Sequence, residues 1–257
     1  MRSFYARLEG MHLCLLAPER ERIPGSFINV SEDARRHGAL LDEVQRLRGG
    51  VYVQDSALPG GALDKHGRHR DPVDASCWHM ALLDGHGNVR AAIRMAIHFA
   101  GQEEVTLANL QAAHLVRRMP SPMRQKFVVA LTDFIGDAAR STACFFETGG
   151  WVLDEAVRRH AAAPVTVAAV YALARALGGA RGIGAATTRH GSASVLKRFG
   201  GFEVLCGKNE TLKPFHDPYY GCEMEILGFV SDRLSPSCET TVTDIQRALA
   251  TIPVFTR

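Results

Sequence analysis

The segment at residues 144–153 reads CFFETGGWVL, an apolar run of the length and composition of a strand. An arginine-containing turn follows, RRHAAAP at residues 158–164, and leads into an apolar helix predicted over residues 165–177. The rest of this block is predicted as strand, helix and strand, over residues 181–187, 192–199 and 202–205. Strands that alternate with helices in this way predict an α/β (α+β) domain with a mixed central sheet.

The turn before the helix is suited to an anionic ligand. The first amides of a helix have no partner within the helix, and the helix dipole adds partial positive charge there. Arg158 and Arg159 stand just before this point, where compensation of the dipole alone would favour acidic residues. We therefore expect this turn to hold the phosphate of a ligand, although surface charges flanking a helix are the alternative interpretation.

The remaining segments can be placed more coarsely. A helix is expected over residues 33–48, ending at the pair Gly49-Gly50, and a long polar loop over 55–72 is of the kind that often forms a functional lid. A β-hairpin follows at 78–83 and 89–95, joined by a turn-forming cluster. Further elements are predicted as helices over 109–118, 123–140 and 243–250 and a strand over 223–230.

Composition limits the possible functions. With 257 residues, of which 46% are hydrophobic and 22% charged, the chain can form one domain over 1–257, with extensions of unknown role at 1–32 and 231–257. The net charge of +3 without long runs of one sign does not indicate a nucleic-acid surface. The apolar segment 11–17 is too short to cross a membrane. The six cysteines show no C-x-x-C spacing, so we expect reduced thiols, no metal site and a cytoplasmic protein.

The order of these predicted helices and strands along the chain resembles that of the GNAT superfamily of N-acetyltransferases. The donor loop of that superfamily, Q/R-x-x-G-x-G/A, is similar in spacing to Arg158-x-x-Ala161-x-Ala163, in which alanine replaces glycine. A Cβ atom limits how closely a backbone can approach a phosphate, so this helix must begin without a left-handed residue. The resemblance implies a mixed sheet flanked by helices and a pantetheine thioester as the acyl donor.

The resemblance is closer to one branch, the acyl-homoserine-lactone synthases and the related long-chain N-acyl amino acid synthases. Arg48 and Tyr52 look like the branch's R-x-x-x-F, and Asp71 and Asp74 look like its D-x-x-D. Arg94 followed by Met95 looks like its R-L. The segment at 147–151 resembles its E-x-S-R-F, but Gly150 stands where the branch has arginine, and Leu58 stands where it tends to carry tryptophan. These departures favour the acyl-transfer chemistry over the use of S-adenosylmethionine.

The resemblance implies direct attack of an amine on the thioester carbonyl, with acyl-CoA or acyl-ACP (acyl carrier protein) as co-substrate and no tightly bound cofactor. Glu147, a carboxylate in an apolar strand, is the predicted general base, with His79 and His114 as less favoured candidates. Gly149 and Gly150 mark the expected opening of two strands, where an amide could face the carbonyl. The predicted donor-binding residues are Arg158, Arg159, Ala161, Ala162 and Ala163. The predicted acceptor-binding residues are Arg48, Tyr52, Asp71, Asp74 and Arg94.

Two other functions remain open from the sequence. One is an acyl-homoserine-lactone synthase proper, which would consume S-adenosylmethionine. The other is a catalytically silent acyl-CoA-binding regulatory module, which the alanines at 161 and 163 suggest. The preferred prediction is an N-acyltransferase acting on the amine of a small molecule, plausibly an amino acid because paired arginines and aspartates suit both of its charges.

Overall fold

The structure is a computed structural model that describes residues 10–19, 23–101, 104–158 and 162–257, with only the backbone of 162 and 163. Two compact units divide the chain. Unit 1 comprises Met1–Ala96, Gly150–Leu173 and Ser237–Arg257, and unit 2 comprises Ile97–Gly149 and Ala174–Pro236. A strand or helix that crosses a boundary contributes to both units.

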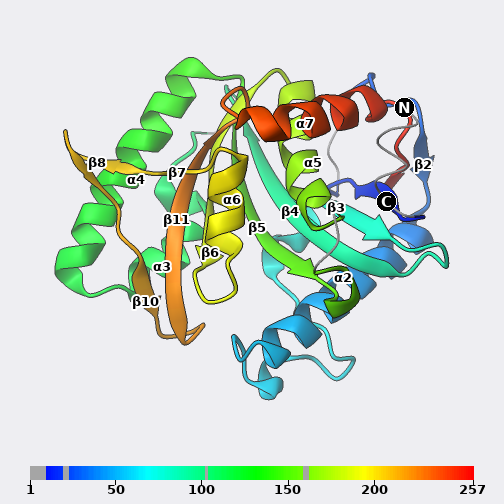
Figure 1. Ribbon diagram of the computed structural model, residues 1–257, viewed down its shortest axis with the longest axis horizontal. Coiled ribbons are helices and arrows are strands. Elements are labelled where there is room, and N and C mark those ends of the chain that lie inside the picture. Colours follow the sequence, from blue (N-terminus) through cyan, green and yellow to red (C-terminus); the bar gives the residue numbers. More distant parts are fainter. Residues whose placement is uncertain (1–9, 20–22, 102–103, 159–161) are drawn as a thin grey trace. The chain divides into compact units, whose positions relative to one another are not determined.

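Unit 1 is built on a mixed sheet in the order β2-β12-β1-β3-β4 (Figure 1). Its strands are β1 (His12–Leu16), β2 (Val30–Glu32), β3 (Cys77–Leu83), β4 (Val89–Phe99) and β12 (Val254–Thr256). The expected hairpin is confirmed, because β3 and β4 pair antiparallel with His79 opposite Arg94. On the other side, β12 pairs parallel with both β1 and β2. This short strand was absent from the sequence prediction, since three residues, VFT, carry too little periodicity.

Three α-helices cover this sheet, with α2 (Ala34–Gln54) on one face and α5 (Ala162–Ala176) and α7 (Pro236–Ala248) on the other (Figure 1). Leu40, Leu41 and Val44 of α2 pack with Leu16 and Ala81 of the sheet. Opposite them, the indole N–H of Trp151 donates to the Thr166 hydroxyl of α5 at 3.0 Å. Short 3₁₀ turns connect the elements: η1 (Gly60–Ala62), η2 (Pro72–Ser76) and η4 (Glu155–Val157).

Helix α2 does not end at Gly49-Gly50, so this part of the sequence prediction was wrong. Both glycines are helical and α2 continues to Gln54. A Cβ atom built on Gly49 would lie 2.7 Å from the carbonyl oxygen of Gly67, whereas one built on Gly50 would meet nothing within 4 Å. Gly49 is therefore required by the close approach of the loop and not by a helix end.

Unit 2 contains the second half of the secondary structure, in which the first residues of β5 (Cys144–Leu153) pair parallel with β6 (Ala180–Thr187). Strand β11 (Cys222–Val230) pairs antiparallel with β6, with β10 (Phe215–Asp217) and with β7 (Phe202–Glu203). Strands β8 (Leu205–Cys206) and β9 (Glu210–Thr211) form a separate hairpin. Its helical elements are η3 (Leu107–Asn109), α3 (Ala112–Arg118), α4 (Ser121–Ser141) and α6 (Ser192–Phe199).

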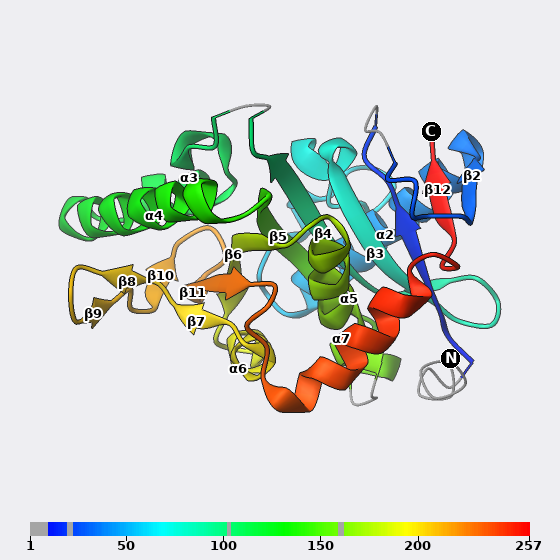
Figure 2. The same cartoon turned by 90° about the horizontal axis from the view of Figure 1, so that it is seen from above.

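Helices α3 and α4 lie beside the strands of unit 2 (Figure 2), and the buried side chains of these helices and strands form its core. Phe127, Leu131 and Ile135 of α4 are buried with Ile183 of β6 and Met224 of β11. The predicted bounds of β5 and α6 are confirmed, and β6 and β11 begin one residue earlier than predicted. Helix α5 begins at residue 162, three residues before the predicted start, so Pro164 lies in its first turn.

Gly49 and Gly50 allow a matched test of the close approach between α2 and the carbonyl oxygen of Gly67. We expect Gly49→Ala to destabilise the protein, because the new Cβ would overlap a backbone oxygen that cannot move away freely. Gly50→Ala should instead stabilise it by about 0.5–1 kcal/mol, the ordinary gain of alanine over glycine in an exposed helix. Urea denaturation of both variants measures the difference, and equal effects would contradict the assigned role of Gly49.

Candidate functional site

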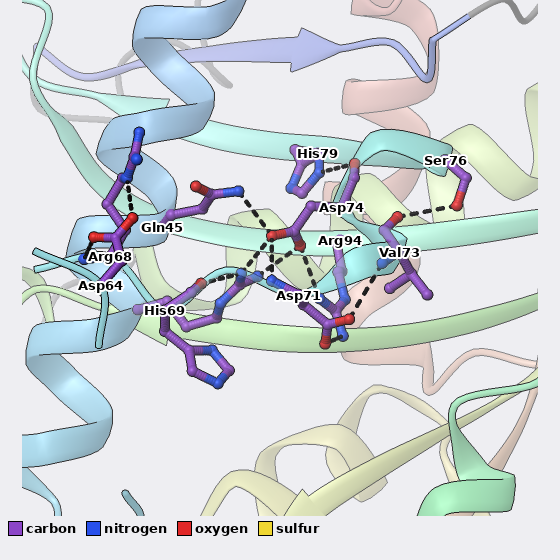
Figure 3. Close-up of polar contacts among 11 residues, drawn as sticks. Gln45, Asp64, Arg68, His69, Asp71, Val73, Asp74, Ser76, His79 and Arg94 are labelled. Carbon is purple, nitrogen blue, oxygen red and sulfur yellow. Dashed lines mark hydrogen bonds and ion pairs between the residues drawn. The ribbon is translucent and has the colours of Figure 1, made fainter. Parts of the chain in front are cut away.

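The residues of the D-x-x-D and arginine motifs meet in unit 1 around the carboxylate of Asp74 (Figure 3). Arg48, from α2, donates from Nη1 to Oδ1 at 2.9 Å and from Nη2 to Oδ2 at 2.6 Å. Arg94, from β4, donates from Nη1 to Oδ1 at 2.8 Å and from Nη2 to Asp71 at 2.7 Å. Gln45 donates to Oδ2 at 3.0 Å. The structure thus brings together four of the five predicted acceptor-binding residues as one ion-pair network.

The network is deeply buried at its centre and more open at Asp71. The side chains of Arg48 and Asp74 are 1% and 3% exposed, against 12% for Arg94 and 18% for Asp71. Burial alone would raise the pKa of Asp74, but the hydrogen bonds and charge of Arg48, with the charge of Arg94, hold it well below the usual value. Burial also opposes the charge of Arg94, yet the carboxylates of Asp71 and Asp74 raise its pKa.

Asp74 has no capacity left for a ligand. A carboxylate offers about four lone-pair sites. Asp74 already receives two hydrogen bonds from Arg48, one each from Arg94 and Gln45, and one from the backbone N–H of Asp71 at 3.2 Å. Asp71 is different, because among the residues that the structure describes its Oδ2 accepts only from Arg94, while the Val73 N–H and the capping box with Asp74 engage the rest of the carboxylate. A ligand amine would therefore meet Asp71, and Asp74 would position the two arginines.

The turn that carries both aspartates is stabilised by hydrogen bonds among its own residues. Asp71 is the N-cap of η2, with Pro72 at the first position, and the side chains of Asp71 and Asp74 form a reciprocal capping box. The preceding loop is fixed to α2, because Arg68 bridges Asp64 and Asp42, and the His69 N–H donates to the Gln45 carbonyl. Arg48 also donates to the His69 carbonyl at 2.6 Å. These contacts hold the loop in place and do not favour the expected movement of a lid.

His79 contacts the backbone of the turn that carries Asp74. Its Nε2 lies 2.8 Å from the carbonyl oxygen of Asp74, and its side chain is only 1% exposed. With Nε2 as the donor, Nδ1 is buried and has no hydrogen-bond partner among the residues that the structure describes. Burial lowers the pKa of His79 to about 4, and the nearby arginines add to this effect. His79 is therefore a neutral structural partner of the turn and is not aimed at a reacting group.

Tyr52 and Gly150 lie beside Arg48. The ring of Tyr52, one turn further along α2, contacts that of His69, with centroids 5.5 Å apart. Gly150 has φ +61°, and a Cβ atom on it would lie 3.3 Å from Nη1 of Arg48 and 3.6 Å from Arg94. An arginine at this position would need a strained backbone and would place a third guanidinium against two others. The departure at Gly150 is thus matched to its surroundings.

Glu147 lies in the part of β5 that belongs to unit 2. Its Oε2 accepts from the Gln111 N–H at 2.6 Å and its Oε1 from the Ala112 N–H at 2.7 Å, at the start of α3. These are two amides that the helix leaves unpaired, so Glu147 caps α3 from a strand distant in sequence. Sequence reasoning did not predict this contact.

The pairing of β5 with β6 ends where the glycines begin. The parallel register runs from Cys144 opposite Ala180 to Thr148 opposite Gly184, although both strands continue. From Gly149 onward, no pairing of β5 with β6 is present among the residues that the structure describes. Backbone amides at an opening between two strands can donate to a ligand.

The predicted donor-binding residues are only partly described. Arg158 pairs with Asp55, with Nη2 to Oδ2 at 3.2 Å, and donates to the Leu153 carbonyl at 3.3 Å. Ala162 and Ala163 form the first turn of α5. Arg159 and Ala161 lie outside the described residues. The described part therefore contains the start of α5, whereas the guanidinium of Arg158 is engaged by Asp55.

Comparison with known proteins identifies the class of fold. No protein-family model matches the chain, and no curated protein matches its sequence. Solved structures do match: TofI in complex with an inhibitor and MTA is 15% identical, with a TM-score of 0.53, over 93% of this chain and 99% of TofI. The fold class predicted from the sequence is confirmed.

Two further matches are described as CoA-dependent acyl-homoserine lactone synthases. MesI is 14% identical with a TM-score of 0.51, over 82% of this chain and 89% of MesI. BjaI, solved with SAM and isopentyl-CoA, is 14% identical with a TM-score of 0.50, over 88% of this chain and 91% of BjaI. This chain therefore has the fold of acyl-homoserine lactone synthases.

The described residues contain neither a membrane-spanning helix nor a metal-binding cluster. None of the helices there is long and apolar enough to cross a membrane. In the same part of the chain, histidine, cysteine, aspartate and glutamate side chains form no group that could hold a metal ion.

Gln45 and the carbonyl of His69 belong to the network but were absent from the sequence prediction. Gln45 lies three residues before Arg48 on α2, and this spacing puts both side chains on one helix face. That spacing could have indicated Gln45. No pattern in the sequence could have indicated the backbone oxygen of His69.

Replacement of Asp74 should be costly. We expect Asp74→Asn to lower the free energy of unfolding by about 3–5 kcal/mol, because two guanidinium groups would lose a buried counter-charge. The difference from the wild type should shrink below about pH 4, since a carboxyl whose pKa is lowered by folding loses its stabilising effect as the pH falls. Glu210→Gln, in the exposed pair with Lys126, should change stability by less than about 1 kcal/mol.

The pH dependence of stability should contain a contribution from His79. The pKa of His79 is lowered to about 4 in the folded state, so the unfolded state binds more protons between pH 6.5 and 4. The free energy of unfolding therefore decreases as the pH is lowered through this window. His79→Gln keeps a donor for the Asp74 carbonyl but cannot titrate, so its melting temperature should depend less on pH there. His86→Gln, in an exposed turn, is the control. Parallel profiles for all three proteins would refute the buried neutral state.

Proposed function

We propose that this protein is an N-acyltransferase that moves an acyl group from a pantetheine thioester to the amine of an amino acid. The observation that carries the proposal is the fold of the CoA-dependent synthases, together with the loss of β6 pairing at Gly149. BjaI, described as CoA-dependent, was solved with isopentyl-CoA, which supports a donor that carries the CoA arm here. Acyl-CoA and acyl-ACP carry the same pantetheine arm, and either fits the proposal.

The reaction needs no nucleophilic side chain. The neutral amine attacks the thioester carbonyl, a C–N bond forms, the C–S bond breaks, and the products are an amide and a free thiol. An amide of the unpaired edge at Gly149 or Gly150 donates to the carbonyl oxygen as negative charge develops on it. Glu147 accepts the amine proton, directly or through water.

The donor and acceptor would be held by charged groups. The first amides of α5, with Arg158, Arg159 and residues 161–163, hold the phosphate of the donor. In the acceptor site, Asp71 meets the ammonium group of an amino acid before it loses its proton, and Arg48, Tyr52 and Asp74 hold Arg94 and the turn in place. The Cβ contact of Gly150 with Arg48 argues against a residue of the synthase type there, and hence for an amino acid over SAM.

Thiol release tests the function. The purified protein is incubated with acyl-CoA esters of different chain length and each standard amino acid, and we expect free thiol and an N-acyl amino acid in equal amounts. SAM replaces the amino acid in a second series, in which release of MTA would show an acyl-homoserine lactone synthase instead. Thermal stabilisation by CoA without thiol release in any series would show a non-catalytic binding module.

Glu147→Gln examines the proton transfer in the same assay. We expect turnover to fall by about 10²–10⁴-fold while affinity for the CoA ester is retained. Glu155→Gln, in an exposed turn outside the proposed site, is the matched control. Unchanged turnover would remove Glu147 from the role of base, and lost donor affinity would place it in a different site.

A further inference from the structure

A cavity of about 420 Å³ lies beside the ion-pair network, within unit 1. Asp71 and Asp74 form one wall, and Leu41 and Gln45 of α2 form another. The remaining lining residues are Glu19, Arg70, Pro72, Ala75 and Arg257. The cavity therefore adjoins the network at Asp71, its most exposed carboxylate.

The positive side of the cavity has donors to spare. Arg70 lines the cavity and makes no hydrogen bond or ion pair with any residue that the structure describes. Its guanidinium offers five N–H donors in a planar fork that fits a carboxylate. Arg257 is partly used by its ion pair with Glu19, but that pair remains 43% and 36% exposed. A carboxylate in the cavity would thus meet at least one uncommitted guanidinium.

The negative side has acceptors to spare. Oδ2 of Asp71 accepts one hydrogen bond from the described residues, that of Arg94, and retains a lone pair. Asp71 is also fixed in place by the capping box of η2 and by Arg94. An ammonium group in the cavity would find a charged acceptor that needs no reorganisation. Arg70 precedes Asp71 in the chain, so the two opposite charges stand side by side at the wall.

The other lining groups add a small apolar surface. Leu41, Pro72 and Ala75 present carbon atoms to the cavity, between the charged groups. A free amino acid matches this combination, since it carries one carboxylate, one ammonium group and a side chain. The volume also suffices, because an amino acid is much smaller than 420 Å³.

We infer that this cavity binds a free α-amino acid, with the carboxylate on Arg70 and the ammonium group on Asp71. The inference deepens the proposed function and rests on it for the identity of the ligand as acceptor. Binding itself does not depend on acyl transfer. Arg70 is then a specificity-determining residue for the carboxylate, which neither the D-x-x-D nor the arginine motif includes.

Binding is measured without an acyl donor, so that it is independent of turnover. Each standard L-amino acid is added at millimolar concentration and followed by saturation-transfer NMR and calorimetry. We expect at least one to bind. Its carboxamide, which lacks the negative charge, and its N-acetyl derivative, which lacks the positive charge, should each bind about 10- to 100-fold more weakly.

Two arginine variants test whether Arg70 contacts the carboxylate of the amino acid. Arg70→Gln should lower affinity for the amino acid and abolish its advantage over the carboxamide. Arg46→Gln removes the same charge from an exposed position on α2 outside the cavity and should bind like the wild type. Thermal denaturation checks that both variants remain folded.

Several results would overturn the inference: no amino acid binds, the carboxamide binds equally well, or Arg70→Gln behaves like the wild type. The proposed function fails separately. Thiol release that is indifferent to Arg70→Gln would leave the acyltransferase and remove the cavity as its acceptor site. Binding without thiol release would leave the cavity and remove the acyltransferase.

Discussion

The organisation of unit 1 depends on the buried carboxylate of Asp74. Its two guanidinium partners come from a helix and from a strand, and neither could be buried with its charge uncompensated. The carboxylate therefore ties α2, the turn after the loop and β4 to one point. Because every acceptor site of Asp74 is occupied, the group acts on chemistry only through the residues it orients. The outer carboxylate, Asp71, is the one with capacity left for a ligand.

Two different requirements explain the glycines near this network. Gly49 is needed because the loop carbonyl of Gly67 passes too close for a side chain. Gly150 is needed because the backbone is left-handed and two arginines already fill the adjoining space. In the second case the absence of a side chain changes the chemistry as well as the packing, since it keeps a third positive charge away from the network. The distinction follows from what each missing Cβ would touch.

Much of the fold could be predicted from the sequence, whereas the site could be predicted only in part. The hairpin, β5 and α6 were recognisable because their apolar patterns are long and end at clear turn signals. The end of α2 and the strand β12 were not, because each is decided by contacts with distant segments. The resemblance named Arg48, Asp71, Asp74 and Arg94 together, and these residues do form one network, but it could not show that they are hydrogen-bond partners of one another. The contact of Glu147 with the α3 amides is likewise a tertiary feature without a local signal.

The loop before η2 is attached to α2 by several side-chain and backbone contacts. Arg68 spans Asp64 and Asp42, and both the amide and the carbonyl of His69 are engaged with α2. Swinging this segment outward would strip a buried guanidinium of one partner, so it behaves as a rigid wall. A ligand that meets Asp71 would therefore find a carboxylate already fixed by Arg94 and by the η2 turn, so that little conformational entropy is lost at this group on binding.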